Sequence, residues 1–167
     1  MPKKNISHSI AHVIYIALYC VLIISAFIHY NSAGLTELLY VGWATLIFGV
    51  VLLSWSSRSR KKEHSWNDTN KETLVEDGIY AFVRHPEFLG HILIISALVI
   101  ISQHWINLVI GTILIVLLCF AMIEEEKRNI EKFGDAYRNY MKRVPRINLL
   151  IGSWRLIHKK RNRERMN

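Results

Sequence analysis

Three long stretches of this chain contain no Asp, Glu, Lys or Arg: 10–30, 38–55 and 88–123. A membrane-spanning helix needs about 20 mostly apolar residues, so each of the first two stretches suits one span. The third is too long for a single span, and the polar sequence SQHWIN at 102–107 interrupts it. The pattern predicts four transmembrane helices, at about 10–31, 35–56, 87–102 and 107–124.

A soluble bundle of buried helices is the main alternative for such apolar stretches. Helices at the surface of a soluble protein carry a polar face opposite their apolar stripe, and these stretches carry almost no polar face. We therefore expect an all-α integral membrane protein with about four transmembrane helices and a cytoplasmic helical segment at its C-terminal end.

Basic residues predict the orientation of the helices. The chain has 21 Lys and Arg against 13 Asp and Glu, and the basic residues gather before the first span, after the second and after the fourth. The short loops at 31–34 and 102–107 contain none. Because cytoplasmic loops carry an excess of Lys and Arg, both termini and residues 56–87 are predicted to be cytoplasmic. The basic tail at 159–167 is then expected to meet anionic lipid rather than nucleic acid.

The same pattern divides the chain into three parts. They are a transmembrane hairpin at 1–61, a polar cytoplasmic connection at 62–86, and a second hairpin with cytoplasmic helices at 87–167. Gly134 breaks the helix that leaves the membrane, and Pro145 ends the next one, so a short helix is predicted at Asp135–Arg143. Residues 147–158 are expected to lie in the membrane interface.

Three polar motifs are predicted to meet at the cytoplasmic end of the second hairpin. They are Arg84-His85-Pro86 where the third span begins, three glutamates at 124–126 where the fourth ends, and Val144-Pro145-Arg146 further on. The turn at 102–107 makes the two spans antiparallel neighbours, so the first two motifs lie close in space. Adjacent carboxylates repel each other and require a cation, which Arg84 or a cationic ligand can supply.

Each motif also has a plainer interpretation. An Arg-His pair at a helix mouth is often an interfacial anchor, a glutamate run is often a solvated helix surface, and a basic tail is often only a topology signal. The order and spacing of the three motifs together favour a functional site.

The stretches GIYAFVRHPEFLG (78–90) and EEEKRNIEKFGDAYRNYMKRVPR (124–146) resemble the isoprenylcysteine carboxyl methyltransferase family, which is related to the phospholipid methyltransferases. The resemblance covers about residues 73–147. Its matching positions are Gly78, Tyr80, Arg84, His85, Pro86, Gly90, Glu125, Glu126, Phe133, Gly134, Tyr137, Tyr140, Val144, Pro145 and Arg146. Phe88 stands where the family usually has Tyr, so any role of that hydroxyl is absent here or supplied elsewhere.

The resemblance implies an integral-membrane methyltransferase that uses S-adenosylmethionine and takes a lipophilic or prenylated substrate from the bilayer. Carried over by position, the cofactor-binding residues would be Tyr80, His85, Pro86, Phe88, Leu89, Gly90, Glu125, Glu126, Tyr137 and Pro145. The catalytic residues would be Arg84, Glu125, Glu126 and Arg146, with no metal. The arginines would bind a carboxylate of cofactor or substrate, and one glutamate would hold the cofactor's amino group. The short chain suggests a prokaryotic cell membrane protein.

The acceptor is open at this point. A carboxylate such as that of an isoprenylated cysteine is the first expectation, and a phospholipid amine is the alternative, for which a glutamate would serve as the base. An NADPH-dependent sterol-type reductase shares a related C-terminal half, but the run RHPEFLGH departs from its pattern at Glu87, Phe88 and His91. A non-enzymatic membrane scaffold is the third class. Tyr137 and Tyr140 are expected to pack rather than to form hydrogen bonds.

Overall fold

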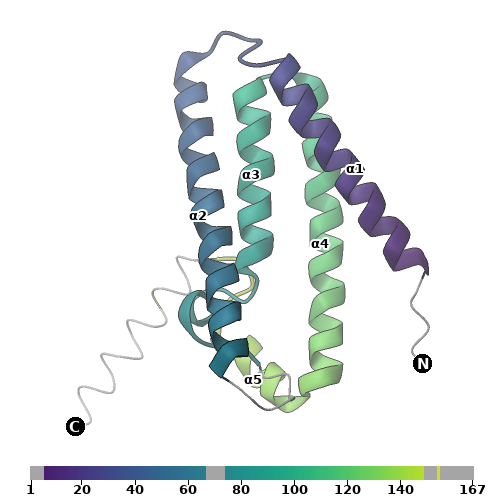
Figure 1. Cartoon of the computed structure of the whole chain (residues 1–167), viewed down its shortest axis with the longest axis vertical. Helices are drawn as coiled ribbons and strands as arrows, with labels where there is room; N and C mark the ends of the chain where they lie inside the picture. The colour runs from purple at the N-terminus through teal and green to yellow at the C-terminus, as the bar shows by residue number, and fades with distance from the viewer. Residues whose placement is uncertain (1–5, 67–73, 149–153, 155–167) are drawn as a thin grey trace. The chain divides into compact units, whose positions relative to one another are not determined.

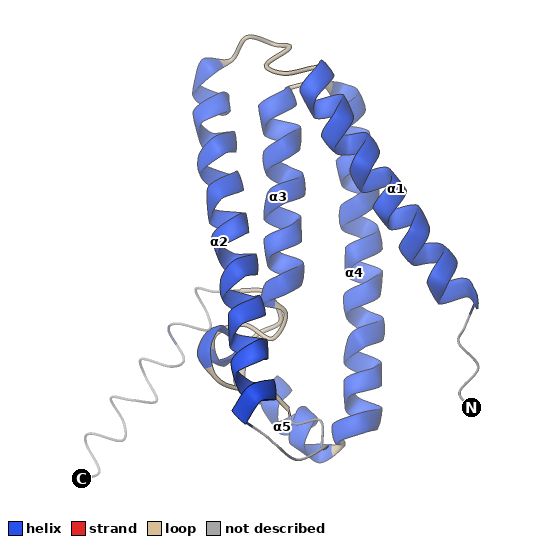
Figure 2. Cartoon of the chain, in the orientation of Figure 1, coloured by secondary structure: helices blue, strands red, loops and turns tan. Residues whose placement is uncertain are grey.

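The computed structural model describes residues 6–66, 74–148 and 154, and every regular element within them is a helix (Figures 1 and 2). The elements are α1 (Ile6–Ile28), α2 (Thr36–Trp66), the 3₁₀ turn η1 (Gly78–Ala81), α3 (Pro86–Ser102), α4 (Trp105–Phe133) and α5 (Asp135–Arg143). The predicted all-α class is therefore confirmed for this part of the chain.

Three of these helices are long and apolar enough to cross a membrane. Their candidate spans are Ile10–Ile28, Thr36–Arg60 and Trp105–Phe133, whereas the apolar helix Pro86–Ser102 is shorter. Three of the four predicted spans are thus supported, and the fourth exists as a helix whose crossing stays a prediction. These helices expose apolar side chains, whose contact with water is unfavourable, so a lipid bilayer is the environment that suits them.

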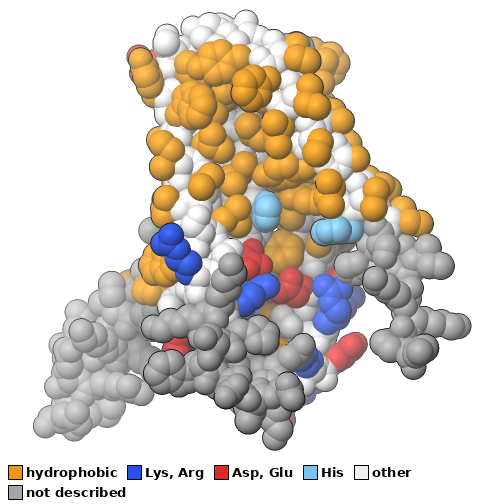
Figure 3. Space-filling view, viewed as in Figure 1, with side chains coloured by type: hydrophobic (Ala, Val, Ile, Leu, Met, Phe, Trp, Pro, Cys, Tyr) orange, Lys and Arg blue, Asp and Glu red, His pale blue; other side chains and the backbone are white. Residues whose placement is uncertain are grey.

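The chain forms two compact units. One consists of Met1–Gly49 with Ile92–Ala121, and the other of Val50–His91 with Met122–Asn167. The first unit exposes large hydrophobic side chains such as Val13, Phe27 and Tyr40, and hydrophobic side chains cover the face of α1 seen in Figure 3. The predicted parts 1–61, 62–86 and 87–167 divide the chain by role and stay a prediction.

Two turns are joined to each other in the first unit. The Asn31 N–H donates to the Ile101 carbonyl at 3.0 Å. The Gln103 side chain bonds both backbone groups of Leu35, at 2.9 and 2.8 Å. Only two residues separate α3 from α4, and a Cβ on Gly111 of α4 would lie 2.6 Å from Val99 of α3. The predicted tight hairpin is therefore present.

The second unit packs α5 through a small aromatic cluster. Tyr137, Tyr140 and Val144 are buried in it, with Leu74, Ile130, Phe133 and Met141 packed around them. The predicted helix Asp135–Arg143 is confirmed at both ends. Gly134 separates it from α4 with a φ of 55°, a left-handed conformation that glycine adopts readily.

Some predicted boundaries differ from the structure. The first helix ends at Ile28 rather than near residue 31, and α2 runs on to Trp66 beyond the predicted span end at 56. A helix continues as long as its backbone bonds are made, so the end of the apolar stretch marks the membrane edge and not the helix end. The predicted interfacial segment 147–158 and basic tail lie almost entirely outside the described residues.

Candidate functional site

Two backbone hydrogen bonds hold the loop before α3 against the segment after α5. The Arg84 N–H donates to the Pro145 carbonyl at 3.0 Å, and the His85 N–H donates to the Arg146 carbonyl at 3.1 Å. Val144 ends α5 in an extended conformation, which lets the two segments run side by side. Pro145 has no N–H of its own, so it takes part only as an acceptor.

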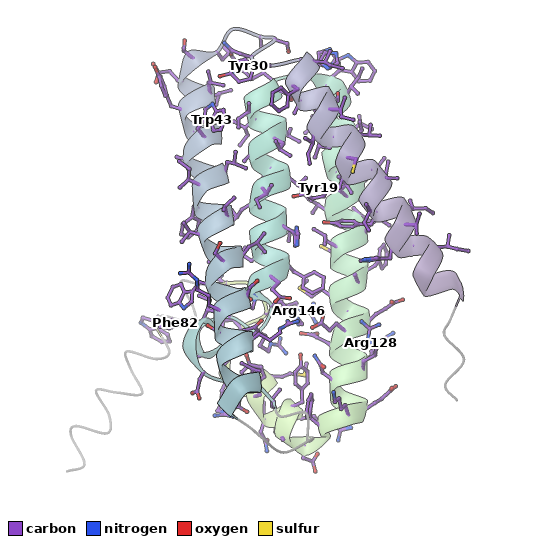
Figure 4. All side chains as sticks on the ribbon, in the orientation of Figure 1. Tyr19, Tyr30, Trp43, Phe82, Arg128 and Arg146 are labelled. Carbon is purple, nitrogen blue, oxygen red and sulfur yellow. The ribbon has the colours of Figure 1, made fainter. Side chains whose placement is uncertain are left out.

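Glu126 is the centre of the site that this pairing creates. Its carboxylate Oε1 lies 3.1 Å from Arg84 Nη1 and 3.3 Å from His85 Nε2. Arg146 donates from Nε to Oε1 at 3.1 Å and from Nη2 to Oε2, the two-pronged geometry that makes Arg–carboxylate pairs strong. Arg146 points toward α4 (Figure 4). The cationic partner expected for the acidic run is therefore present.

Arg84 and Arg146, the two arginines that pair with Glu126, differ in how deeply their side chains are buried. The Arg84 side chain is 8% exposed and the Glu126 side chain 6%, whereas Arg146 is 42% exposed. Arg84 Nη1 forms an ion pair with Glu126, but neither its Nη1 nor its Nε has a partner at hydrogen-bonding geometry among the described residues. Buried donors without acceptors are costly, so Arg84 has N–H groups that a bound acceptor would stabilise.

His85 is neutral at this site near pH 7. Burial lowers its pKa from 6.5 to about 4, and the Glu126 carboxylate opposes that shift only in part. The neutral ring donates from Nε2 to Glu126, which leaves Nδ1 as its acceptor atom. With His85 neutral, two arginines face one carboxylate, and the immediate surroundings of Glu126 carry one excess positive charge.

Glu125 differs from its neighbour Glu126. It is half-buried and forms no ion pair or hydrogen bond within the described part of the chain. The charges that act on it are Arg60, Glu87, Arg128 and Glu126. Sequence reasoning could not separate the roles of the two glutamates, and the structure does so, because Glu126 is fully engaged by protein groups and Glu125 is not.

Tyr80 links this site to α2 and α5. Its carbonyl accepts a hydrogen bond of 2.7 Å from the Tyr140 hydroxyl, so Tyr140 does more than pack. Its own hydroxyl lies 2.9 Å from Ser56 Oγ and accepts from Arg60 at 3.2 Å. Burial raises the pKa of the Tyr80 hydroxyl, which therefore stays protonated at neutral pH.

The other predicted residues lie around this centre. The Phe88 ring meets the His85 ring edge-on at 5.5 Å between centroids, and Pro86 is fully buried. Tyr137 is buried with its ring 5.9 Å from that of Tyr140, and its hydroxyl shares a hydrogen bond with the Asn129 side chain, so it also does more than pack. Leu89 is half-buried and Gly90 buried in the first turn of α3.

Sequence reasoning missed three residues that surround the Tyr80 hydroxyl. Ser56 gave no signal, Arg60 was interpreted only as a topology signal, and Glu87 was noted only as a departure from a reductase pattern. Each contacts Tyr80 or its partner across at least seven residues of sequence, and one sequence offers no periodicity that predicts such contacts.

Comparison with known proteins agrees with this arrangement of motifs. The family model described as phospholipid methyltransferase matches residues 38–136, more than half of the chain. The chain is 33% identical over 73 residues to the protein-S-isoprenylcysteine O-methyltransferase of Schizosaccharomyces pombe, covering 43% of this chain and 31% of that protein. It is 30% identical over 128 residues to the methanethiol S-methyltransferase of Pseudomonas deceptionensis, covering 68% of this chain and 44% of that protein.

The matched regions span less than half the length of either relative. No solved structure is significantly similar to the chain. The family match includes Arg84, His85 and Glu126 and ends before Arg146. These matches confirm the resemblance first seen in the motifs, and the apolar helices make the chain an integral membrane protein. The chain belongs to the phospholipid methyltransferase family of membrane methyltransferases.

Proposed function

We propose that this chain is an S-adenosylmethionine-dependent methyltransferase that methylates a lipophilic acceptor taken from the bilayer. The acceptor group proposed first is a carboxylate, such as that of an isoprenylated cysteine. Support comes from the family match and from two relatives whose names specify methyl transfer to oxygen and to sulfur.

The observation that carries the proposal is the contrast between Arg84 and Glu125. Arg84 has buried N–H groups that lack acceptors, and Glu125 is a carboxylate without an ion pair among the described residues. The amino-acid end of S-adenosylmethionine carries both a carboxylate and an ammonium group. The donor set therefore fits this cofactor: Arg84 would hold the carboxylate, and Glu125 the ammonium.

The remaining residues organise the site. When bound, S-adenosylmethionine would supply an electrophilic methyl group to an in-line displacement, a reaction that depends on alignment more than on acid or base. Glu126 holds Arg84 and Arg146 in place and offsets their charge. Neutral His85 adds no charge and fixes one edge of the site by donating to Glu126. Phe88 and Pro86 keep water away from this edge, which favours an anionic acceptor.

Arg146, whose side chain is 42% exposed, would receive an acceptor that reacts as an anion. A carboxylate meets this condition at neutral pH, and a thiolate, which the methanethiol relative suggests, meets it after losing a proton. A phospholipid amine is the alternative within the family, and Glu125 would then be the candidate base.

The first test is cofactor binding by purified protein in detergent. Calorimetry with S-adenosylhomocysteine and S-adenosylmethionine is expected to show binding that Glu125→Gln weakens strongly. Glu124→Gln is the matched control, because Glu124 is exposed on the same turn, and it should leave affinity unchanged. Binding of NADPH without either adenosyl compound would move the chain to the reductases, and binding of none of the three would favour a scaffold.

The second test identifies the acceptor. Transfer of a radiolabelled methyl group is measured to a farnesylated cysteine derivative, to phosphatidylethanolamine and to methanethiol in separate reactions. Our proposal expects transfer to the farnesylated cysteine, with the product hydrolysed by mild base as an ester. Transfer to phosphatidylethanolamine alone would replace the carboxylate with an amine as acceptor.

We also propose that α3 completes four spans, that both termini lie in the cytoplasm of a prokaryotic cell, and that the basic tail binds anionic lipid. Variants with a single cysteine test the orientation in a background without Cys20 and Cys119. A membrane-impermeant maleimide is expected to label Ala33→Cys in intact cells. It should label Asp135→Cys only in inverted vesicles. The opposite labelling would reverse the topology.

A further inference from the structure

Arg60 connects α2 to the turn that precedes the site. Its Nη2 donates to Glu87 Oε2 at 2.8 Å and to the Tyr80 hydroxyl at 3.2 Å. Ser56, one helical turn earlier, lies 2.9 Å from the same hydroxyl, and it is fully buried. One face of α2 thus bonds to Tyr80 on η1 and to Glu87 on the first turn of α3.

This connection reaches the site through the backbone. Tyr80 is anchored at both ends, by its hydroxyl to α2 and by its carbonyl to Tyr140 of α5. Its turn leads within a few residues to Arg84 and His85, and Glu87 comes two residues after His85. The contacts of Arg60 with Tyr80 and Glu87 therefore lie on either side of the segment that carries Arg84 and His85, two of the partners of Glu126.

Gly78 gives independent evidence that α2 lies tightly against this turn. A Cβ at Gly78 would stand 2.9 Å from Ser59 Oγ and 3.5 Å from Ser59 Cβ, so the Ser59 hydroxyl would have to turn away. Gly78 also has a φ of +63°. The backbone conformation favours glycine there, and the contact with Ser59 shows how close α2 lies to the turn.

Arg60 also acts on Glu125 electrostatically. Arg60 and Arg128 attract the Glu125 carboxylate, whereas Glu87 and Glu126 repel it. Arg128 has its own partner in Glu124 at 3.9 Å, and Glu126 is engaged by Arg84 and Arg146. Arg60 therefore pairs with Glu87 and also attracts Glu125 electrostatically, so its removal would leave the repulsion between these two carboxylates without that opposing charge.

We infer that Arg60 is a positioning residue of the methyltransferase site, which fixes the Tyr80–Glu87 segment and supplies a positive charge near Glu125, the group assigned to the cofactor's ammonium. The inference rests on the proposed function, because it assigns that ligand to Glu125. It adds a residue of α2 that lies outside the three motifs.

A plain surface ion pair is the competing explanation. The side chains of Arg60 and Glu87 are 51% and 28% exposed, and exposed pairs contribute only about 0–1 kcal/mol to stability. A change in melting temperature is therefore a poor test. The two explanations differ in the pH dependence of ligand binding, because only the positioning role links Arg60 and Glu87 to the protonation of Glu125.

The experiment measures the affinity for S-adenosylhomocysteine between about pH 4 and 8 in full-length protein at low salt. It compares wild type with Arg60→Gln, Glu87→Gln, the double variant and Arg60→Lys. Arg58→Gln is the matched control, because Arg58 is exposed on the same helix and pairs with no residue in the described ranges. His85, Arg84, Arg146 and Arg128 are unchanged in every variant, so their contribution cancels.

Affinity is expected to fall at acid pH as Glu125 takes up a proton. Arg60→Gln should move this fall to higher pH, because a favourable cation is lost. Glu87→Gln should move it to lower pH, because a repelling carboxylate is lost. The double variant should lie between them, and Arg60→Lys and Arg58→Gln should follow wild type. High salt should shrink both shifts.

Each other outcome counts against the inference. Wild-type binding with shifts that are absent, or of one sign in both variants, would overturn it and leave the proposed function standing. Wild-type protein that binds no S-adenosylhomocysteine at any pH would overturn both. If Arg60→Gln fails to fold, as judged by helicity and size-exclusion behaviour, the shift in Glu87→Gln decides the question.

Discussion

The Tyr140 hydroxyl donates a buried hydrogen bond of 2.7 Å to the backbone carbonyl of Tyr80. This single contact joins α5 to the turn that leads into the site. Tyr140→Phe keeps the ring and removes the donor, so the buried Tyr80 carbonyl loses this hydrogen bond. The expected loss is about 1–3 kcal/mol of unfolding free energy.

Thermal unfolding in detergent measures this loss as a lower melting temperature. Tyr40→Phe is the control, because Tyr40 is 69% exposed, and it should melt like wild type. Equal melting of the two variants would show that the Tyr140 hydroxyl contributes nothing.

Glu126→Gln is expected to destabilise the protein more than any other single loss of a carboxylate on α4. It removes the counter-charge of Arg84, whose side chain is only 8% exposed, and an unpaired buried charge costs about 3–5 kcal/mol. Titration with SDS in mixed micelles measures the change. Arg146→Gln should cost less, because Arg146 is 42% exposed, and Glu124→Gln should cost almost nothing. A larger loss from Glu124→Gln than from Glu126→Gln would contradict the assignment of Glu126 as the centre.

Acid should weaken the folded state through His85. Its pKa is about 4 when folded and 6.5 when unfolded, so below pH 6.5 the unfolded chain binds a proton that the folded chain does not. Stability is therefore complete above about pH 6.5 and falls as the pH drops toward 4. Melting curves across this range should show a smaller loss in His85→Gln than in wild type. Parallel curves for the two proteins would mean that His85 is not buried in its neutral form.

Gly78→Ala should cost more stability than Gly34→Ala. Both glycines have positive φ values, +63° and +72°, for which an L-residue pays roughly 1–2 kcal/mol. Only Gly78 also lacks space, because a Cβ would stand 2.9 Å from Ser59 Oγ, whereas nothing lies within 4 Å at Gly34. Ser59→Ala added to Gly78→Ala should recover the steric part of the loss. The close contact would be refuted by equal melting temperatures for Gly78→Ala and Gly34→Ala.

The sequence predicted the elements whose signals are local. Gly134 and Pro145 punctuate the chain on either side of α5, and both ends of that helix were predicted correctly. The turn at 102–107 makes α3 and α4 antiparallel neighbours, so the start of α3 lies near the later part of α4. The pairing of Arg84 with the acidic run therefore also followed from local signals. The continuation of α2 to Trp66 did not, because polar residues can extend a helix beyond the membrane without any change in periodicity.

The choice between Glu125 and Glu126 could not be predicted in this way. It depends on which face of α4 meets the side chains of Arg84 and Arg146, which both reach Glu126. The contacts of Arg60 are of the same kind, because they depend on how far α2 is rotated about its axis. A rotation of one residue would move Arg60 away from Tyr80 and leave every apolar stretch unchanged.

The main-chain pairing of Arg84 and His85 with Pro145 and Arg146 has a consequence for redesign of the site. Backbone amides and carbonyls are common to nearly all residue types, so this frame can survive replacement of the side chains that it displays. A library that varies positions 84, 85 and 146 together would exchange the chemistry while the loop geometry persists. Positions 84 and 85 each donate a backbone N–H to this frame. Proline lacks that N–H, so such a library should omit proline at both positions.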